Sequence, residues 1–416
     1  MNRNIRLLTI GVAVRMLGSA IYGPFIALYL HNVLNVGYIE IGLIILVIGG
    51  AQIPLSIAGG LVADRMRRKS LMIIGLATEA ATTAVLAYAF SIESLFLAIL
   101  AAFCGSSVSS VAGPAFSAYI ADFAEGSERT RGFTYYRIGF NAGFAAGVAM
   151  GGLFIATIGF SGGVAVAAGV VAAATVGLFL FLGPSPRDVL PSGRPGPAFP
   201  VAPRVDPAPS RSFRESLGIL RRDRPALEVA VAFALVTFVA SQWQFIFPLY
   251  VHNVLGISYA LLGIGLSLNG IVVVVGQSPT TESVIGWRHT SIAVLGIGLY
   301  GVAFVGLGAA GLLGLFPVVV FFVAVVVLTI GENLASIPQA TLPSNLAPRQ
   351  EVGSYNGAFN AFSTLGFILA TLAGTVVLAT VANPLLIWLV LIAPAVPAAL
   401  LLRHASQRIP AAANRA

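Results

Sequence analysis

A sixteen-residue segment occurs twice in this chain, and this repeat limits the possible folds more than any other feature. Residues 28–43 are LYLHNVLNVGYIEIGL and residues 249–264 are LYVHNVLGISYALLGI, with eight identities at an offset of 221. That offset in a chain of 416 residues indicates two similar halves. In membrane proteins, repeated halves enclose a site at their interface and rock about it, which is typical of a transporter.

The composition places both halves in a membrane. Hydrophobic residues make up 57% of the chain and charged residues 9%, whereas a soluble domain has about 25% charged residues. A spanning helix needs roughly 20 apolar residues, and lipid requires every backbone polar group to be paired within the segment. The sequence therefore predicts an all-α integral membrane protein with twelve transmembrane helices in two pseudo-symmetric six-helix bundles. The predicted spans are 7–30, 38–62, 70–90, 95–121, 131–157, 160–182, 226–251, 257–281, 290–311, 315–341, 353–379 and 383–402.

The distribution of basic residues predicts the orientation. Of the 23 Lys and Arg residues, 20 lie in the N-terminal segment, the even-numbered connections or the C-terminal tail, and Arg131 is the first residue of span five. Since Lys and Arg mark the cytoplasmic side, we expect both termini on that side of the cell membrane. The net charge of +8 follows from this asymmetry, so it does not indicate binding to nucleic acid.

The predicted domains follow from these spans. Residues 1–183 form the first bundle, and residues 225–404 form the second. Residues 184–224 are a cytoplasmic Pro-rich linker, and residues 405–416 are a cytoplasmic tail. Within the linker, Phe213, Leu217 and Leu220 have helical spacing between arginines. This pattern fits an amphipathic helix on the membrane surface and a plain basic stretch equally well.

The connection between spans two and three carries the strongest local motif, GGLVADRMRRK at residues 59–69. It resembles the signature of the major facilitator superfamily at the same connection, GxLxDRxGRR/K. With the predicted spans and the duplication, the resemblance covers essentially the whole chain. Arg67 stands where the family pattern has its second glycine.

The motif predicts a conformational latch. Gly60 lets two helices approach closely, and Asp64 can meet the N–H groups at a helix N-terminus. Arg65 and Arg68 can pair with carboxylates on neighbouring helices. The resemblance implies that Arg68 pairs with Asp122, at the end of span four. The alternative is that these charges only anchor the loop on the cytoplasmic side.

Span five carries a ridge of glycines at intervals of four residues. Gly139, Gly143, Gly147 and Gly151 make up this ridge, and Gly353, Gly357 and Ala361 have the same spacing in span eleven. Small residues allow close helix contact in membranes, so we interpret both ridges as packing surfaces.

Three charged residues lie deep in predicted spans, namely Arg15, Glu79 and Glu332. Embedded charges are costly and tend to be functional. The resemblance implies that spans one, four, seven and ten line the cavity, which includes Arg15 and Glu332. Glu332 also resembles the tenth-span acidic residue of bacterial drug–proton antiporters. We predict that Glu332 carries a proton, and the alternative is a satisfied polar contact with Asn333 or a neighbouring helix. Arg15 is the counter-charge of Glu332, a ligand for an anionic substrate, or a side chain that extends to the cytoplasmic surface. For Glu79 we expect a hydrogen-bonded structural role.

The remaining predicted cavity residues are neutral. Amide and aromatic groups among Ala, Val, Leu and Phe suit an amphiphilic or weakly polar ligand, and a sugar also fits. The candidates are Tyr22, Gln242, Trp243, Gln244, Asn269, Asn356 and Asn360.

Several classes of function are excluded or disfavoured. No GxxxxGK[ST] loop occurs, which excludes an ATP-driven pump within this chain. No catalytic grouping or metal spacing is present, so we expect neither an enzyme nor a cofactor. The predicted function is a monomeric, proton-coupled exporter of amphiphilic small molecules. An uptake permease for a sugar or small metabolite and a non-transporting membrane sensor or scaffold are the alternatives.

Overall fold

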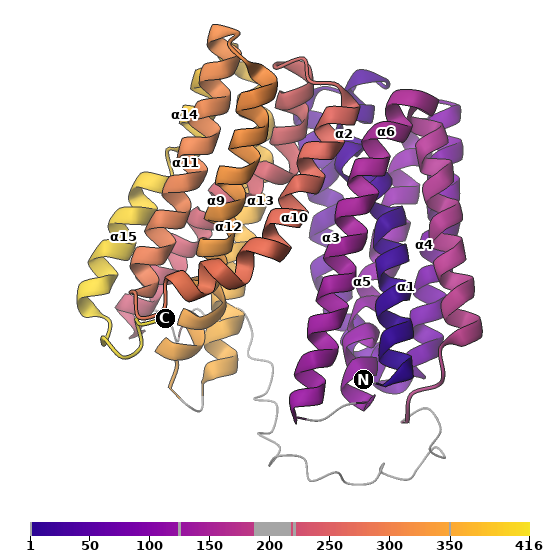
Figure 1. The fold of residues 1–416 in the computed structure, drawn as a ribbon, viewed down its shortest axis with the longest axis horizontal. Helices are drawn as coiled ribbons and strands as arrows, with labels where there is room; N and C mark the ends of the chain where they lie inside the picture. Colours follow the sequence, from indigo (N-terminus) through magenta and orange to yellow (C-terminus); the bar gives the residue numbers. More distant parts are fainter. Residues whose placement is uncertain (1, 124–125, 187–217, 219–221, 349–350) are drawn as a thin grey trace. The chain divides into compact units, whose positions relative to one another are not determined.

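The computed structural model describes residues 2–123, 126–186, 218, 222–348 and 351–416, without the side chains of residues 53, 57, 60, 61, 63, 64 and 126–130. Across these residues the chain is helical, and an isolated antiparallel β-bridge joins Arg288 to Arg415. The helices of Figure 1 are α1 (Arg3–Tyr22), the 3₁₀ helix η1 (Gly23–Phe25), α2 (Ile26–Asn32), α3 (Tyr38–Arg65), α4 (Arg68–Ser91), α5 (Leu95–Phe123), α6 (Gly126–Phe181), α9 (Arg224–Asn253), α10 (Tyr259–Ser283), α11 (His289–Leu313), α12 (Pro317–Leu346), α13 (Val352–Thr380), α14 (Pro384–Ile392) and α15 (Ala395–Arg408).

Eleven helical segments among the described residues are long and apolar enough to cross a membrane. They coincide with the apolar runs of the sequence. The longest, Arg131–Phe181, has 51 residues, roughly twice the length of one span. Gly159, with φ 74° and ψ 175°, interrupts its helical geometry where the sequence predicts a connection. The chain is therefore a multi-pass membrane protein, and the count of twelve spans stays a prediction.

The chain forms two compact units. Unit 1 comprises Met1–Pro200 and Ser258–Ile271, and unit 2 comprises Val201–Ile257 and Val272–Ala416. The predicted first bundle, residues 1–183, lies within unit 1, but the first half of α10 belongs to unit 1 as well. Close packing explains this: a Cβ added to Gly152 of α6 would lie 2.3 Å from the carbonyl oxygen of Tyr259 in α10.

The predicted linker and tail differ in how far the structure describes them. Most of the linker lies outside the described residues, including the three apolar residues of its possible amphipathic helix. The predicted tail begins inside α15, which ends at Arg408. Its last residues pack within unit 2 against α11 and α15, where Asn414 is 1% exposed.

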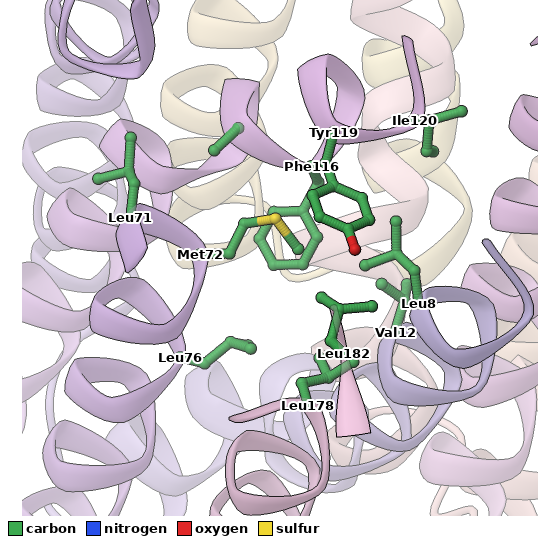
Figure 2. Packing of buried hydrophobic residues seen from close by; sticks show 11 residues of the cluster. Leu8, Val12, Leu71, Met72, Leu76, Phe116, Tyr119, Ile120, Leu178 and Leu182 are labelled. Carbon is green, nitrogen blue, oxygen red and sulfur yellow. The ribbon is translucent and has the colours of Figure 1, made fainter. Parts of the chain in front are cut away.

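The core of unit 1 is an apolar cluster shared by α1, α4, α5 and the end of α6 (Figure 2). Phe116 and Tyr119 of α5 lie among leucines from the other helices. The Tyr119 hydroxyl donates a hydrogen bond to the carbonyl of Gly183 at 2.7 Å. This bond ties the residues that follow α6 to α5, because a buried hydroxyl needs a partner.

The glycine ridge of α6 packs directly on the backbone of α1. Cβ atoms added at Gly139, Gly143, Gly147 and Gly151 would each lie 2.1–2.7 Å from a carbonyl oxygen of α1. Any side chain there would separate the two helices. The packing interpretation of this ridge is confirmed, as expected for small residues at membrane helix interfaces.

The second predicted ridge is wrong in its position. Cβ atoms added at Gly353 and Gly357 of α13 would meet no atom of the described residues within 4 Å. Gly366 takes the packing role instead, because its added Cβ would lie 2.1 Å from the carbonyl oxygen of Ala234 in α9. Spacing identifies a face of small residues, but it does not say which face meets another helix.

The repeated segment makes equivalent contacts in both units. The Tyr29 hydroxyl donates to the carbonyl of Phe90 in α4 at 3.1 Å. Its counterpart, Tyr250, donates to the carbonyl of Leu307 in α11 at 3.2 Å. Each tyrosine thus ties the end of the first span of its half to the third, which gives a physical reason for its presence in both copies.

The turn after each tyrosine is also the same. His31 Nδ1 lies 2.9 Å from the carbonyl oxygen of Val36, and His252 Nδ1 lies 2.7 Å from that of Ile257. The left-handed position is Asn35 in one copy, with φ 55°, and a glycine in the other, with φ 69°. Asn and Gly are the residues that adopt this conformation most readily. The structure therefore confirms that these two segments are local structural repeats.

Candidate functional site

A buried ion pair joins α1 to α4 in unit 1. Arg15 Nε donates to Glu79 Oε2 at 2.6 Å, and the two side chains are 17% and 9% exposed. The Arg15 guanidinium carbon also lies 5.6 Å from the ring centroid of Phe116 in α5. A cation over an aromatic face is favourable, more so where water is excluded.

Hydroxyl groups complete the surroundings of the Glu79 carboxylate. Ser19 donates to Oε1 at 2.6 Å, and Ser109 of α5 lies 3.4 Å from Oε2. One turn along α4, Thr83 donates to the Glu79 carbonyl at 2.7 Å and lies 3.4 Å from the Tyr22 hydroxyl. An ionised carboxylate only accepts hydrogen bonds, so this cluster of donors suits it. The polar network links α1, α4 and α5.

This network corrects the predicted partner of Arg15. We expected Arg15 to be the counter-charge of Glu332 or a ligand for an anionic substrate, whereas its partner in the structure is Glu79. The predicted structural role of Glu79 left out this cation. Helical periodicity places Arg15 on a face of α1, but it cannot say which helix packs there. Glu332 belongs to α12 in unit 2, where it is half-buried.

The predicted latch motif spans the end of α3 and the start of α4. Gly60 and Asp64 belong to the last turns of α3, but their side chains are outside the described part of the chain. Arg65 ends α3 and is exposed. Arg67 adopts φ −62° and ψ 127°, an extended conformation open to any residue. The turn therefore forms without the glycine of the family pattern.

The expected pairing across this end of unit 1 is present. Arg68, the first residue of α4, is 5% exposed, and its Nε lies 3.7 Å from Asp122 Oδ2 at the end of α5. Removing one partner of a buried ion pair is strongly destabilising. The pair can therefore tie α4 to α5, and its role as a latch stays a prediction.

At the same repeat offset, unit 2 has an uncharged arrangement. His289, the counterpart of Arg68, is 2% exposed and faces Thr341 and Asn345 of α12 at 3.4–3.5 Å. Hydroxyl and amide groups thus stand where unit 1 has a carboxylate. At the same offset from Asp64 the sequence has Ile285, so unit 2 also lacks the acidic residue of the motif at residues 59–69.

The predicted cavity residues do not share one environment. Gln242 is 1% exposed, and its amide nitrogen donates to the Ala370 carbonyl of α13 at 3.3 Å. Asn356 donates to Ser344 Oγ at 2.9 Å. These two side chains therefore tie helices together, because an amide away from water binds its nearest partners. Their place in a substrate cavity stays a prediction.

The other cavity candidates are distributed between the units. Tyr22 is part of the Glu79 network. Asn269 is 7% exposed in the part of α10 that belongs to unit 1. In unit 2, Trp243 is half-buried, with its ring centroid 4.4 Å from that of Phe247, whereas Gln244 and Asn360 are exposed.

Ser19 and Ser109 are functional candidates that sequence reasoning missed. Ser19 lies four residues after Arg15, on the same face of α1. This spacing could have marked it, because a hydroxyl one turn from a buried charge is a ready partner. Ser109 comes from a different helix, and no local pattern connects it to Glu79.

Comparisons with known proteins agree with this architecture. The family model described as Major Facilitator Superfamily matches residues 8–371. The uncharacterized MFS-type transporter YttB of Bacillus subtilis (strain 168) is 26% identical over 379 residues, covering 90% of this chain and 88% of that protein. The uncharacterized MFS-type transporter YhjO of the same organism is 25% identical, with coverages of 90% and 86%.

Solved structures show the same fold. A POT family transporter in complex with 5-aminolevulinic acid has a TM-score of 0.75 at 15% identity, covering 98% of this chain and 97% of that chain. A mutant of the nucleoside transporter NupG has a TM-score of 0.74 at 15% identity, covering 97% and 100%. At such identities the likeness concerns the fold alone. From the family model and the relatives, the chain belongs to the Major Facilitator Superfamily, as a membrane transporter and not an enzyme.

Proposed function

We propose that this transporter exports amphiphilic small molecules in exchange for protons, by alternating access. The observation that supports this choice most is the pairing of Arg15 with Glu79. Arg15 is the deeply embedded cation that an anionic metabolite would need, and a dicarboxylate or phosphate ester would need at least two. Because Glu79 already neutralises Arg15, the cavity favours neutral or cationic ligands.

In this proposal Glu332 carries the proton. Glu79 is engaged by Arg15 and two serine hydroxyls, so protonating it would break several bonds at once. Glu332 is half-buried on α12, and a carboxyl group at such a depth in a membrane protein can serve a proton pathway. Its protonation would remove a charge from the spans and ease the passage of a cationic ligand.

The test uses purified protein in liposomes with an imposed pH gradient. We expect the gradient to drive movement of cationic and neutral amphiphilic dyes, but not of sugars or organic acids. Glu332→Gln should abolish gradient-driven movement and leave substrate counterflow intact. Glu351→Gln, which alters a carboxylate just before α13, is the matched control and should transport normally.

Each other outcome identifies a different function. Full gradient-driven transport by Glu332→Gln would refute the coupling assignment. Gradient-driven uptake of a sugar or an organic acid, without the dyes, would favour the permease. Movement of no compound under any gradient would favour a sensor or scaffold.

We also propose that Arg68 and Asp122 belong to a latch that stabilises one of the two alternating states. Their ion pair is consistent with this role. Asp122→Asn should shift the distances between labels on the ends of α3 and α12 by favouring the opposite state. Unchanged distances with normal transport would leave these residues as topology signals.

A further inference from the structure

Unit 2 contains a cavity of about 380 Å³ at the start of α11 and the end of α15. Both helices pack against each other there. The lining combines two arginines with hydroxyl, amide and aliphatic groups. It consists of Arg288, Thr290, Ser291, Val294, Leu402, Arg403, Ser406 and Gln407.

The charge of this cavity is entirely positive. Its lining includes no carboxylate, and no described Asp or Glu forms an ion pair with Arg288 or Arg403. Arg288 Nη1 donates to Ser406 Oγ at 3.3 Å, which directs its guanidinium toward α15. Glu228 of α9 is engaged elsewhere, by Arg408 at 3.1 Å. The cavity is therefore suited to an anion.

Residues near the end of the chain support the wall of the cavity. The buried Asn414 accepts a hydrogen bond from the Thr290 backbone N–H at 3.1 Å, and its amide donates to Thr290 Oγ1 and Ser406 Oγ at 3.1 and 3.3 Å. The β-bridge between Arg288 and Arg415 constrains the backbone beside the first arginine. Groups positioned before binding lose less entropy when a ligand arrives.

The cavity lies at the polar end of an exposed apolar surface. On α15, Leu400 is 60% exposed and precedes Arg403 by three residues, so both lie on one face. On α11, Leu295 is 42% exposed and follows Ser291 by four residues. In a membrane, such apolar faces contact acyl chains. A molecule that fits both features has an acyl chain and an anionic head.

We propose that the cavity between α11 and α15 binds a phosphate group that is presented by an anionic phospholipid. The arginine fork matches phosphate oxygens with two parallel hydrogen bonds. Thr290, Ser291 and Gln407 line the same cavity and carry neutral hydrogen-bonding groups. Basic pockets between transmembrane helices bind lipid headgroups in this way. This site is separate from the proposed transport function and is tested without any transport assay.

The experiment compares lipid binding to the full chain in detergent by native mass spectrometry. The probes are phosphatidylglycerol, phosphatidylcholine and inorganic phosphate. Phosphatidylglycerol should bind at least tenfold more tightly than phosphatidylcholine. Replacing both Arg288 and Arg403 by Gln should weaken phosphatidylglycerol binding roughly 30-fold, about fivefold for each arginine.

A charge-matched control separates a site from general attraction. Arg222 and Arg224 are exposed arginines of unit 2 that do not line the cavity. Their double replacement by Gln should bind phosphatidylglycerol like the unchanged chain. The conservative double variant Arg288→Lys and Arg403→Lys should recover part of the affinity, which would show that the loss in the Gln variant is not caused by misfolding.

Three results would overturn the proposal. Equal binding of phosphatidylglycerol and phosphatidylcholine would remove the headgroup selectivity. An equal loss in the Arg222 and Arg224 control would leave only nonspecific attraction. Competition by millimolar inorganic phosphate, together with an affinity for phosphate alone that equals the affinity for phosphatidylglycerol, would identify free phosphate as the ligand instead of a lipid.

Discussion

Breaking the Arg15–Glu79 pair from the arginine side should destabilise the protein strongly. In Arg15→Met an aliphatic side chain remains in place of the arginine. Glu79 is only 7% exposed, and its carboxylate would keep only hydroxyl groups as partners. Removing one partner of a buried pair costs about 3–5 kcal/mol, because an uncompensated charge is left behind.

The opposite change should be milder. In Glu79→Gln the side-chain oxygen can still accept from Arg15, and Ser19 keeps an amide partner. We expect a loss of about 1.5–3 kcal/mol, the range for hydrogen bonds to charged groups. The double variant lacks both charges, so its loss should be smaller than the sum of the two single losses by about 0.5–3 kcal/mol, the coupling measured for residues in contact.

The assay is unfolding of the purified protein in mixed micelles, followed by circular dichroism as denaturing detergent is added. Arg137→Met is the control, since Arg137 is an exposed arginine in a helix of the same unit. It should change the free energy of unfolding by no more than about 0.5 kcal/mol. An Arg15→Met variant as stable as this control, or losses that simply add in the double variant, would refute the reasoning.

Three further predictions follow from packing and hydrogen bonds. Gly143→Ala should lose about 1–3 kcal/mol of stability through overpacking against the α1 backbone, while Gly169→Ala, at an open position, should lose none; equal thermal stability of the two would contradict the ridge contact. Tyr29→Phe and Tyr250→Phe should each lose about 1 kcal/mol, and unequal losses would argue against equivalent roles in the repeat. Asn414→Ala should lose about 1–3 kcal/mol, because it leaves buried Thr290 groups unpaired; unchanged thermal unfolding would mean that the end of the chain does not support α11.

The sequence was sufficient to locate the apolar helices and the repeat. A run of about twenty apolar residues has one stable form in lipid, because only a helix pairs all its backbone groups locally. The predicted spans therefore coincide with helices, and the break at residues 158–159 appears at Gly159. The two copies of the repeat likewise form the same turn, since its bonds lie within a few residues of the tyrosine.

Part of the candidate site was also accessible from the sequence. The motif at residues 59–69 and its resemblance to a family predicted that Arg68 faces Asp122, and the structure places them 3.7 Å apart. This prediction came from a known pattern of neighbouring helices. The residues themselves, far apart in sequence, carry no such information.

Only the tertiary structure could identify the partner of Arg15. Hydropathy and periodicity describe one helix at a time, and they gave Arg15, Glu79 and Glu332 as three embedded charges of equal standing. Which two of them meet depends on the order and rotation of the packed helices. The close approach of α6 to α1 shows that contacts between segments distant in sequence constrain this order and this rotation. For the same reason only the structure shows that Gln242 and Asn356 tie helices together: an amide group satisfies its hydrogen bonds with whatever the neighbouring helix presents.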